Sequence, residues 1–499
     1  MDAFQGLWTG FQVALSIEGI MFVLIGVVVG TLIGMMPGLG PISAIAIMIP
    51  ITYGMDPAPA LVMMAGVYYG AVFGGSTSSI LLNAPGIAGT VATSFDGYPM
   101  ANNGQAGKAL AIAAISSFIG GTISVILLMM LAPALSSIAI SFGPPAYFAL
   151  MLMGLSAISS LSEGSTIKAL ISAVVGFMVV TIGIDPQTGT QRFTFDSVNL
   201  LDGFDFLIIA LGLFAIAEVC MLVLNRRNRS LSDSQKLGSL KLSKSDLKEM
   251  SGPVTRQSFV GFILGVLPGA GATIASFISY IFEKRISKKP EEFGKGSIKG
   301  VAAPESSNNA ATNGAFVPLL SLGIPGSGTT AVMLGAFLVL DVQPGPLLMT
   351  DRPEIFWGII ASMYIGNVFL LILNLPLIPY LAKILSIPRP MLISLVIMFS
   401  LIGVYSISFN VFDLYMLLVF GLIGFLMRIY SFPAPPFILA FILGGMMEQS
   451  FRQSMTISNG DLSIFVSSPL PLTLIIISLL SFLVPGILKW RKNRYISKV

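Results

Sequence analysis

The chain has 499 residues, of which 55% are hydrophobic and 10% are charged, and its formal net charge is +4. A soluble globular protein carries roughly 25% charged residues, so this composition excludes a protein that covers itself with a polar surface. One cysteine and no histidine exclude an internal disulfide and remove the commonest metal ligand. The sequence therefore predicts an all-α polytopic membrane protein without a cofactor, a cysteine-based metal cluster or a nucleic-acid partner.

Apolar segments follow one another along the chain. Gly19–Met55, Pro57–Phe95 and Ala109–Ser162 contain no charged side chain, and each is long enough for at least one membrane pass of about 20 residues. In chain order we expect apolar helices near residues 18–36, 41–54, 60–83, 108–140, 146–161, 166–184, 204–225, 258–282, 304–323, 327–341, 354–385, 391–408, 411–430, 433–447 and 464–488. Several are too short or too broken to span, so we expect roughly 10–12 transmembrane helices beside re-entrant or broken ones.

Lysine and arginine are concentrated in three clusters. Eight lie between Arg226 and Arg256, six between Lys284 and Lys299, and five between Lys489 and Lys498. Because basic loops stay on the cytoplasmic side of a membrane, we expect these clusters, and with them the C-terminus, to be cytoplasmic. The expected organisation is a first membrane repeat (1–225), a cytoplasmic linker (226–257) and a second membrane repeat (258–499) that ends in further helices and a cytoplasmic basic tail.

One apolar segment, Ser258–Phe282, has basic residues on both sides and the sequence LPGAG at its centre. A single span would place one of the two basic clusters outside. Each arm has about ten residues, or roughly 15 Å as a helix, which is half the hydrocarbon thickness. A re-entrant hairpin fits both the charges and the length. A single kinked span stays open as the alternative, because the charge rule is a tendency.

The helix-breaking pattern occurs twice. Residues 30–40 and 261–271 share the pattern G-x3-G-x2-P-G-x-G at an offset of 231 residues. A second pair follows in the same order, because APGIAGT (84–90) matches IPGSGTT (324–330), with one residue fewer between the Pro-Gly and the next glycine. The first copies lie in a region poor in positive charge and the second among basic loops, which predicts an inverted two-fold repeat. The residues expected to shape the hairpin tips are Pro37, Gly38, Gly40, Pro268, Gly269 and Gly271.

Hydroxyl and amide side chains gather beside these breaks. A broken membrane helix offers free N–H groups that suit an anion and free carbonyls that suit a small cation, and these side chains can serve either. We therefore expect a substrate-binding and ion-binding site, which could include Na+, formed by Ser76, Thr77, Ser78, Ser79, Asn83, Gly86, Gly89, Thr90, Asn308, Asn309, Asn313, Gly326, Ser327, Gly328, Thr329 and Thr330. The alternative for each residue is that hydroxyl groups join neighbouring helices and glycines let them approach closely.

Four carboxylates, Glu163, Glu218, Glu305 and Asp341, fall in or near expected spans, where a charge is a functional hypothesis by default. Glu218 could instead pair near the cytoplasmic interface. Glu305 stands at the start of an expected helix, where an acid is an ordinary helix-end feature. In the sequence DGYP we expect Asp96 to form a turn.

Six longer stretches resemble one known family. In chain order, between about residues 30 and 346, they are GMMPGLGPISAIAIMIPITYGMDPAPAL, YYGAVFGGSTSSILLNAPG, DGYPMA, LPGAGATIASFISYIFEKR, FGKGSIKGVAAPESSNNAA and PLLSLGIPGSGTTAVMLGAF. On these motifs the chain resembles the large membrane subunit of the bacterial tripartite tricarboxylate transporters.

The resemblance implies a secondary transporter of the bacterial cytoplasmic (inner) membrane, which works with a small membrane subunit and an extracytoplasmic solute-binding protein. It also implies import of citrate or other di- or tricarboxylates by symport with Na+ or H+. The implied fold is similar to that of other inverted-repeat transporters with paired hairpins. Such a protein is not an enzyme, and whether it forms a homo-oligomer stays open.

Other functions stay open as alternatives. An organic-anion channel needs a continuous pore in place of occluded sites. An intramembrane enzyme needs a nucleophile or a metal site, and the missing histidines argue against it. A scaffold that transports nothing would leave paired breaks at membrane depth as an energetic cost without a function.

Overall fold

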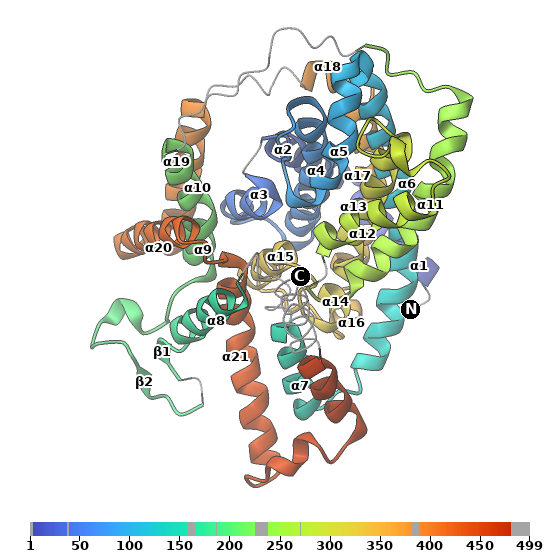
Figure 1. Cartoon of the computed structure of the whole chain (residues 1–499). Coiled ribbons are helices and arrows are strands. Elements are labelled where there is room, and N and C mark those ends of the chain that lie inside the picture. The colour runs from blue at the N-terminus through green and yellow to red at the C-terminus, as the bar shows by residue number, and fades with distance from the viewer. Residues whose placement is uncertain are drawn as a thin grey trace, which may run out of the picture.

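The computed structural model describes residues 3–36, 39–156, 165–185, 187–224, 238–269, 271–381 and 389–480. Within these ranges the regular structure is helical apart from one short hairpin, in which β1 (Gly183–Ile184) pairs with β2 (Gln191–Arg192) in antiparallel register. Figure 1 shows the helices in chain order, from the blue α1 near the N-terminus to the red segments after α21.

The described helices divide between the two halves of the sequence. The first half forms α1 (Ala3–Ala14), α2 (Ile17–Gly34), α3 (Gly40–Met48), α4 (Pro57–Leu82), α5 (Val91–Met100), α6 (Ala106–Ala139), α7 (Pro144–Ser156), α8 (Thr166–Val180), α9 (Phe206–Ala210) and α10 (Ala217–Leu224). The second half forms α11 (Lys244–Val266), α12 (Gly271–Ile286), α13 (Ile298–Gly314), α14 (Phe316–Leu322), α15 (Gly328–Val339), α16 (Leu348–Asp351), α17 (Pro353–Asn374), α18 (Ile378–Leu381), α19 (Arg389–Ser408), α20 (Val411–Ile429) and α21 (Ala434–Ile457). A π-helical turn joins α5 to α6, and another joins α9 to α10.

Six helical segments of the described chain are long and apolar enough to cross a membrane. They are Ile17–Gly34, Pro57–Leu82, Ala88–Ala139, Phe206–Leu224, Pro353–Asn374 and Val411–Ile429. Shorter apolar helices occur at Gly40–Thr52, Pro144–Ser156, Thr166–Val180, Gly328–Val339, Ile393–Tyr405 and Pro469–Leu480. The prediction of an all-α polytopic membrane protein is confirmed.

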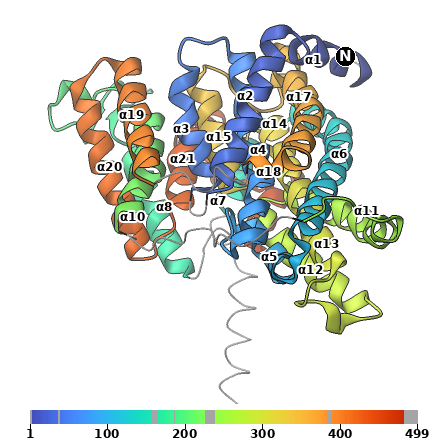
Figure 2. The ribbon, with the colours of Figure 1, turned by 90° about the horizontal axis from the view of Figure 1, so that it is seen from above.

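The helices form two groups that meet at α3 and α15. Figure 2 shows α10, α19 and α20 together on one side, and α6, α11, α13 and α17 together on the other. On the first side α3 contacts α19, and on the second it contacts α4; α15 contacts α3, α4 and α21. Two of the short helices that follow sequence breaks, α3 and α15, therefore lie where the two groups come together.

Glycines bring α2 against α4 at backbone distance. A Cβ built on Gly30 would lie 2.3 Å from the carbonyl oxygen of Val67, and one on Gly34 would lie 2.1 Å from that of Ala71. No side chain fits at these positions, because both neighbouring atoms belong to a helix backbone. The glycine spacing of the first sequence motif is thus the spacing at which two helices touch.

The second motif makes the same kind of contact between α11 and α13. A Cβ built on Gly261 would lie 2.3 Å from the carbonyl oxygen of Ser307, and one on Gly265 would lie 2.2 Å from that of Ala311. The glycine pairs of the two motifs therefore pack in the same way, each against a helix that carries expected site residues.

The chain turns at both Pro-Gly motifs. Gly40 and Gly271, with φ of 61° and 59°, begin the helices that follow the two turns, and Gly269 has φ of 85°. These left-handed values favour glycine. Two residues expected to shape the first tip, Pro37 and Gly38, lie outside the described residues. The second tip is expected at Pro268, which directly follows the C-cap residue of α11.

Some elements differ from their predicted boundaries. The helix α11 begins at Lys244, inside the segment expected as a linker, because Ser243 and Asp246 form a capping box at its start. The helix α21 continues ten residues past its expected end at 447. The sequence pattern gave no indication of α1, of α5 or of the β1–β2 hairpin.

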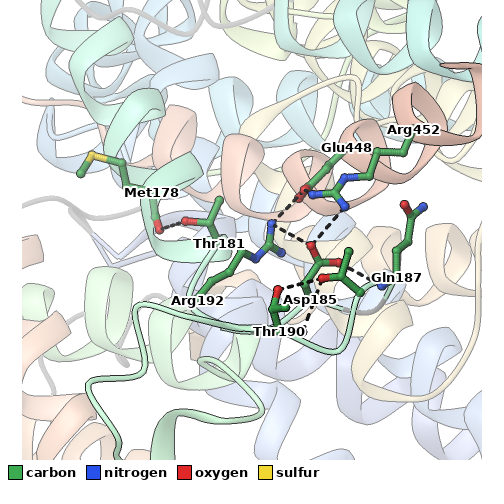
Figure 3. Close-up of polar contacts among 9 residues, drawn as sticks. Met178, Thr181, Asp185, Gln187, Thr190, Arg192, Glu448 and Arg452 are labelled. Carbon is green, nitrogen blue, oxygen red and sulfur yellow. Dashed lines mark hydrogen bonds and ion pairs between the residues drawn. The ribbon is translucent and has the colours of Figure 1, made fainter. Parts of the chain in front are cut away.

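An ion-pair cluster holds the β1–β2 hairpin against α21 (Figure 3). The Asp185 carboxylate lies 3.1 Å from Arg452 and 3.9 Å from Arg192, and Glu448 lies 2.9 Å from Arg192 and 2.6 Å from Arg452. The backbone N–H of Gln187 also donates to Asp185 at 2.9 Å. Two acids and two bases therefore alternate, and they fix the loop after α8 to a helix far away in sequence.

Candidate functional site

Two Pro-Gly breaks interrupt the helices at matching positions. They are residues 84–90, here called the first break, and residues 324–330, the second break. The helix α4 ends at Asn83, whose backbone is left-handed with φ of 49°, and α14 ends at Gly323, with φ of 71°. A left-handed residue at a helix end lets a carbonyl near the end of the helix accept a hydrogen bond from a backbone N–H of the turn that follows. The N–H of Ala84 donates in this way to the carbonyl of Ser78, and the residue after Gly323 makes the equivalent bond. The Asn83 side chain itself is exposed.

The Asn308 side chain of α13 lies on the first break. A Cβ built on Gly89 would lie 2.3 Å from the Asn308 Oδ1 atom, so glycine is required there. Asn308 is fully buried, and neither polar atom of its amide has a hydrogen-bond partner among the described residues. Leaving a buried polar group unpaired costs roughly 1–3 kcal/mol. The amide therefore offers one acceptor and one donor group to a ligand at this break.

The second break is closed by its own side chains. Ser327 is the N-cap residue of α15, where its Oγ accepts from the N–H of Thr330 at 3.2 Å and its N–H donates to the Thr330 hydroxyl at 2.8 Å. The hydroxyl of Tyr68, on α4, lies 3.4 Å from the Ser327 Oγ. A helix of the first half thus contacts the break of the second half, as α13 contacts the first break.

A buried carboxylate stands one helical turn before Asn308. Glu305 is fully buried, and its carboxylate accepts hydrogen bonds from Ser76 at 2.7 Å, Thr93 at 2.5 Å and Ser117 at 2.9 Å. These three hydroxyls come from α4, α5 and α6. The sequence pattern favoured a helix-end role for Glu305, but the residue lies in the middle of α13. Only the nearby run of Ser and Asn in the sequence signalled its place in the site.

Several expected site residues make hydrogen bonds within one helix or between two segments. Ser78 and Ser79 both donate to the Gly75 carbonyl within α4, and Thr90 bonds to the same carbonyl from the first break. Asn313 donates to Ser124 at 2.9 Å and thereby fixes α13 to α6. For Thr90 and Asn313 the alternative expected from the sequence, in which hydroxyl and amide groups join helices, describes the contacts.

The remaining expected residues lie buried around the two breaks. The Asn309 amide donates to the Glu305 carbonyl at 3.0 Å. The Gly326 carbonyl accepts from the N–H of Gly269 at 3.0 Å, so the turn after α11 contacts the second break. A Cβ on Gly86 would lie 2.0 Å from the carbonyl of Gly34, which places the first break against the end of α2. The others are Thr77 and Thr329, which are almost fully buried, and Gly328, which packs on Pro435.

Asp96 does not form a turn. It lies inside α5, fully buried, and its carboxylate accepts from the backbone N–H groups of Gly294, Gly296 and Ser297 at 2.7–2.8 Å and from the Tyr280 hydroxyl at 2.9 Å. The prediction from DGYP is wrong because local sequence does not show which distant amides need an acceptor. Asp96 instead receives the unpaired N–H groups that precede α13.

Three further carboxylates are candidates on the sequence. Glu218 pairs with Arg428 of α20. Glu163 lies outside the described residues. Asp341 lies in the loop after α15, with a left-handed φ of 53°.

A cavity of about 370 Å³ lies beside the loop between α15 and α17. Its walls come from that loop, from the start of α7 and from α21, and they include Tyr147, Asp341, Arg352 and Gln449. The cavity reaches Leu322, the last residue of α14 before the second break. The cavity therefore ends beside the helix that precedes the second break, whereas residues 324–330 of the break, Asn308 and Glu305 are not among its walls.

Comparison with known proteins gives the family. The model of the tripartite tricarboxylate transporter TctA family matches residues 20–439. An uncharacterized 52.8 kDa protein of the TAR-I ttuC′ 3′ region of Agrobacterium vitis is 46% identical over 479 residues, which cover 96% of this chain and 95% of that protein. An uncharacterized protein of the TAR-II ttuC′ 3′ region of the same organism is 50% identical over 216 residues, 43% of this chain and 89% of that one. No solved structure matches. The chain belongs to the tripartite tricarboxylate transporter TctA family.

Proposed function

We propose that the chain is the large membrane subunit of a secondary transporter that imports di- or tricarboxylates, or related organic anions, with a sodium or proton gradient. The observation that carries the proposal is the fully buried, unpaired amide of Asn308 at the first break. Buried amides and free backbone N–H groups at a helix break are donors that suit a carboxylate. Membership of a transporter family supports the same conclusion and argues against an enzyme.

We assign substrate contact to the first break and to the residues that surround it. Asn308, Gly89 and Gly86 would contact the carboxylate, while Ser327 and Thr330 would shape the matching break in the other half. Of the remaining expected residues, those that join helices would hold the site in shape.

The proposal includes two partner subunits and a membrane orientation. The family is described as tripartite, which supports a small membrane subunit and an extracytoplasmic solute-binding protein as partners. The three basic clusters support a cytoplasmic position for the linker and the C-terminus in the bacterial inner membrane.

An inverted repeat with two re-entrant hairpins is part of the proposal. Its support is the matched packing of α2 on α4 and of α11 on α13, together with the contact between α11 and α12 on either side of the LPGAG turn. The first membrane repeat would then comprise residues 1–225, and the second would begin with α11.

Reconstitution tests the proposal. The full chain and its two partner subunits are placed in liposomes, and uptake of labelled citrate, a malonate-like acid and an aromatic carboxylate is measured under separate sodium and proton gradients. We expect saturable uptake that one gradient drives and that internal substrate accelerates by exchange. Uptake that is equal without either gradient would refute coupled transport, and current without saturation would indicate a channel. Recovery of chemically altered substrate would indicate an enzyme.

A further inference from the structure

A cavity the size of one water molecule lies between α4, α6 and α17. Its volume is about 10 Å³, which is the space that the centre of one water-sized sphere needs. One side of its wall is apolar and includes Phe73 and Leu110. The polar side carries Ser76, Thr77, Ser117 and Asn374, and all four residues are at least nine-tenths buried.

Two of these hydroxyls stand between the cavity and a buried carboxylate. Ser76 and Ser117 both donate to the Oε2 atom of Glu305, at 2.7 and 2.9 Å. The negative charge of Glu305 is therefore one hydroxyl group away from the cavity. A buried charge without a counter-charge is strongly unfavourable. The groups around Glu305 therefore determine how much its charge destabilises the folded state.

Glu305 has no cationic partner among the described residues. The basic side chains of the helices that pack against α13 are used elsewhere: Lys108 pairs with Asp246, and Arg256 pairs with Glu283. Asp96, the acid on α5, is held by backbone N–H groups and Tyr280. The other charged groups of α11, α12 and α13 lie toward the ends of those helices, and they are Lys244, Lys248, Glu249, Lys284, Arg285 and Lys299.

The polar wall offers acceptors to whatever fills the cavity. Because Ser76 and Ser117 use their protons on Glu305, only their oxygen lone pairs are left. Asn374 uses its amide N–H on the Leu370 carbonyl at 3.0 Å, and its Oδ1 is buried without a hydrogen-bond partner. These three oxygen acceptors and the hydroxyl group of Thr77 therefore surround a space for one small particle.

We propose that this cavity is a binding site for a sodium ion, with the charge of Glu305 as its counter-charge. Hard cations prefer carbonyl, hydroxyl and carboxylate oxygens; the wall presents hydroxyl and amide carbonyl oxygens, and the carboxylate of Glu305 lies one hydroxyl group beyond it. An anion is excluded by the lone pairs and by the carboxylate. A water molecule would fill the space but would leave the charge of Glu305 uncompensated.

The coupling role of this sodium ion rests on the proposed function, but its binding does not. The ion would lie beside Ser76 and Ser117, which donate to Glu305, and Glu305 is one helical turn from Asn308. Binding of sodium would therefore fix α4, α6, α13 and α17 around the position where the carboxylate substrate binds. This arrangement makes substrate affinity depend on sodium without any shared ligand atom.

Thermal unfolding of the purified full-length chain tests the binding alone. The midpoint is measured as NaCl replaces choline chloride at constant ionic strength, because a ligand of the folded state raises the midpoint as its concentration rises. We expect sodium to raise the midpoint of the wild type by several degrees. In Glu305→Gln and Asn374→Leu the rise should be absent, and in Ser117→Ala the half-maximal sodium concentration should increase about tenfold or more.

A matched control comes from the same helix. Asn367 on α17 is also buried, but its amide donates to Phe118 and Thr122 and does not line the cavity. Asn367→Leu should lower the midpoint while the sodium response stays intact. A wild type that does not respond to sodium, or an Asn374→Leu variant that responds like the wild type, would overturn the proposal. If Glu305→Gln does not fold, the half-maximal sodium concentration of Ser117→Ala tests the proposal in its place, and an unchanged value would overturn it.

A measurement at different pH values distinguishes binding of sodium from binding of a proton. If the midpoint of the wild type rises with falling pH and not with NaCl, and Glu305→Gln removes that rise, the carboxylate takes a proton and the sodium site is refuted. Carboxylate uptake by the reconstituted wild type is measured separately, so a failure of the transport function is not confused with a failure of the ion site.

Discussion

Tyr68 and Asn308 hold the same position in the two halves of the chain. Each directly follows a residue whose carbonyl packs against a helix glycine, Val67 in one half and Ser307 in the other. The hydroxyl of Tyr68 then lies at the second break and the amide of Asn308 at the first. Only the tyrosine has a hydrogen-bond contact there, so the first break is the one with polar groups left for a ligand.

Replacing Asn308 should remove transport without removing the fold. In Asn308→Ala we expect carboxylate uptake to fall at least about tenfold, because a hydrogen bond to a charged group contributes roughly 1.5–3 kcal/mol. The free energy of unfolding should change little, since removal of an unpaired buried amide is favourable and offsets the cost of the cavity that the shorter side chain leaves. Uptake into liposomes and the thermal midpoint measure the two effects.

Asn313 is the matched control for that experiment. It lies on the same helix, but its amide donates to Ser124 and to the Gly121 carbonyl. In Asn313→Ala we expect a loss of about 1–3 kcal/mol of stability, because two buried acceptors lose a donor, with an unchanged KM for substrate. The assignment of Asn308 to the site would be wrong if the two variants changed KM equally.

Gly89 should be required because Asn308 touches it. The Cβ of Gly89→Ala would lie 2.3 Å from the Asn308 Oδ1, so we expect a lower thermal midpoint and no uptake. In the double variant Gly89→Ala with Asn308→Ala, the clash is gone. Its midpoint should return toward the wild-type value, while uptake stays absent. A double variant as unstable as Gly89→Ala would show that another neighbour demands the glycine.

Two glycines of the first sequence motif (residues 30–40) should respond differently to replacement by alanine. A Cβ on Gly34 would lie 2.1 Å from the Ala71 carbonyl oxygen, whereas a Cβ on Gly40 meets no atom within 4 Å. Gly34→Ala must separate two helix backbones, and we expect it to cost about 3 kcal/mol or more. Gly40→Ala suffers only its left-handed φ of 61°, for about 1–2 kcal/mol. Denaturation in detergent gives both values, and equal losses would contradict this account.

Acid should loosen the β1–β2 hairpin through Asp185. The backbone N–H of Gln187 and the nearby charge of Arg452 hold the pKa of Asp185 below its usual range. A depressed folded-state pKa contributes stability above the unfolded value of about 3.9, and this stability is lost as the pH falls through the folded value. We expect Asp185→Asn to lower the thermal midpoint at pH 7 and to flatten its decline below about pH 4. A parallel decline in both proteins would show that other carboxylates cause it.

The positions of the helix breaks could be predicted because proline and glycine act on their own backbone. The apolar pattern predicted a helix over 18–36 and the structure has one at Ile17–Gly34; the LPGAG turn falls between α11 and α12 as expected. Clusters of hydroxyl and amide groups next to the breaks led to the candidate site, which stays a prediction. Helix breaks and local polar clusters depend only on residues close together in the chain, so a single sequence is enough to locate them.

Contacts between distant segments could not be predicted in this way. The three hydroxyls that hold Glu305 are 188–229 residues away from it along the chain. Asp96 is separated by 198–201 residues from the N–H groups that it accepts. This packing decides which polar side chains join helices and which stay unpaired. The sequence alone therefore does not distinguish Asn313 from Asn308.

The bonds of Asp96 also bear on how the chain is made. Its acceptor atoms lie in the half that leaves the ribosome first, and the N–H groups that need them are synthesised about 200 residues later. At ~5–20 residues per second this interval is roughly 10–40 s. During that time α5 carries a carboxylate without its native partners, so α5 cannot reach its final packing before the segment 294–297 has been synthesised. Packing of α5 is therefore completed only after translation has entered the second half of the chain.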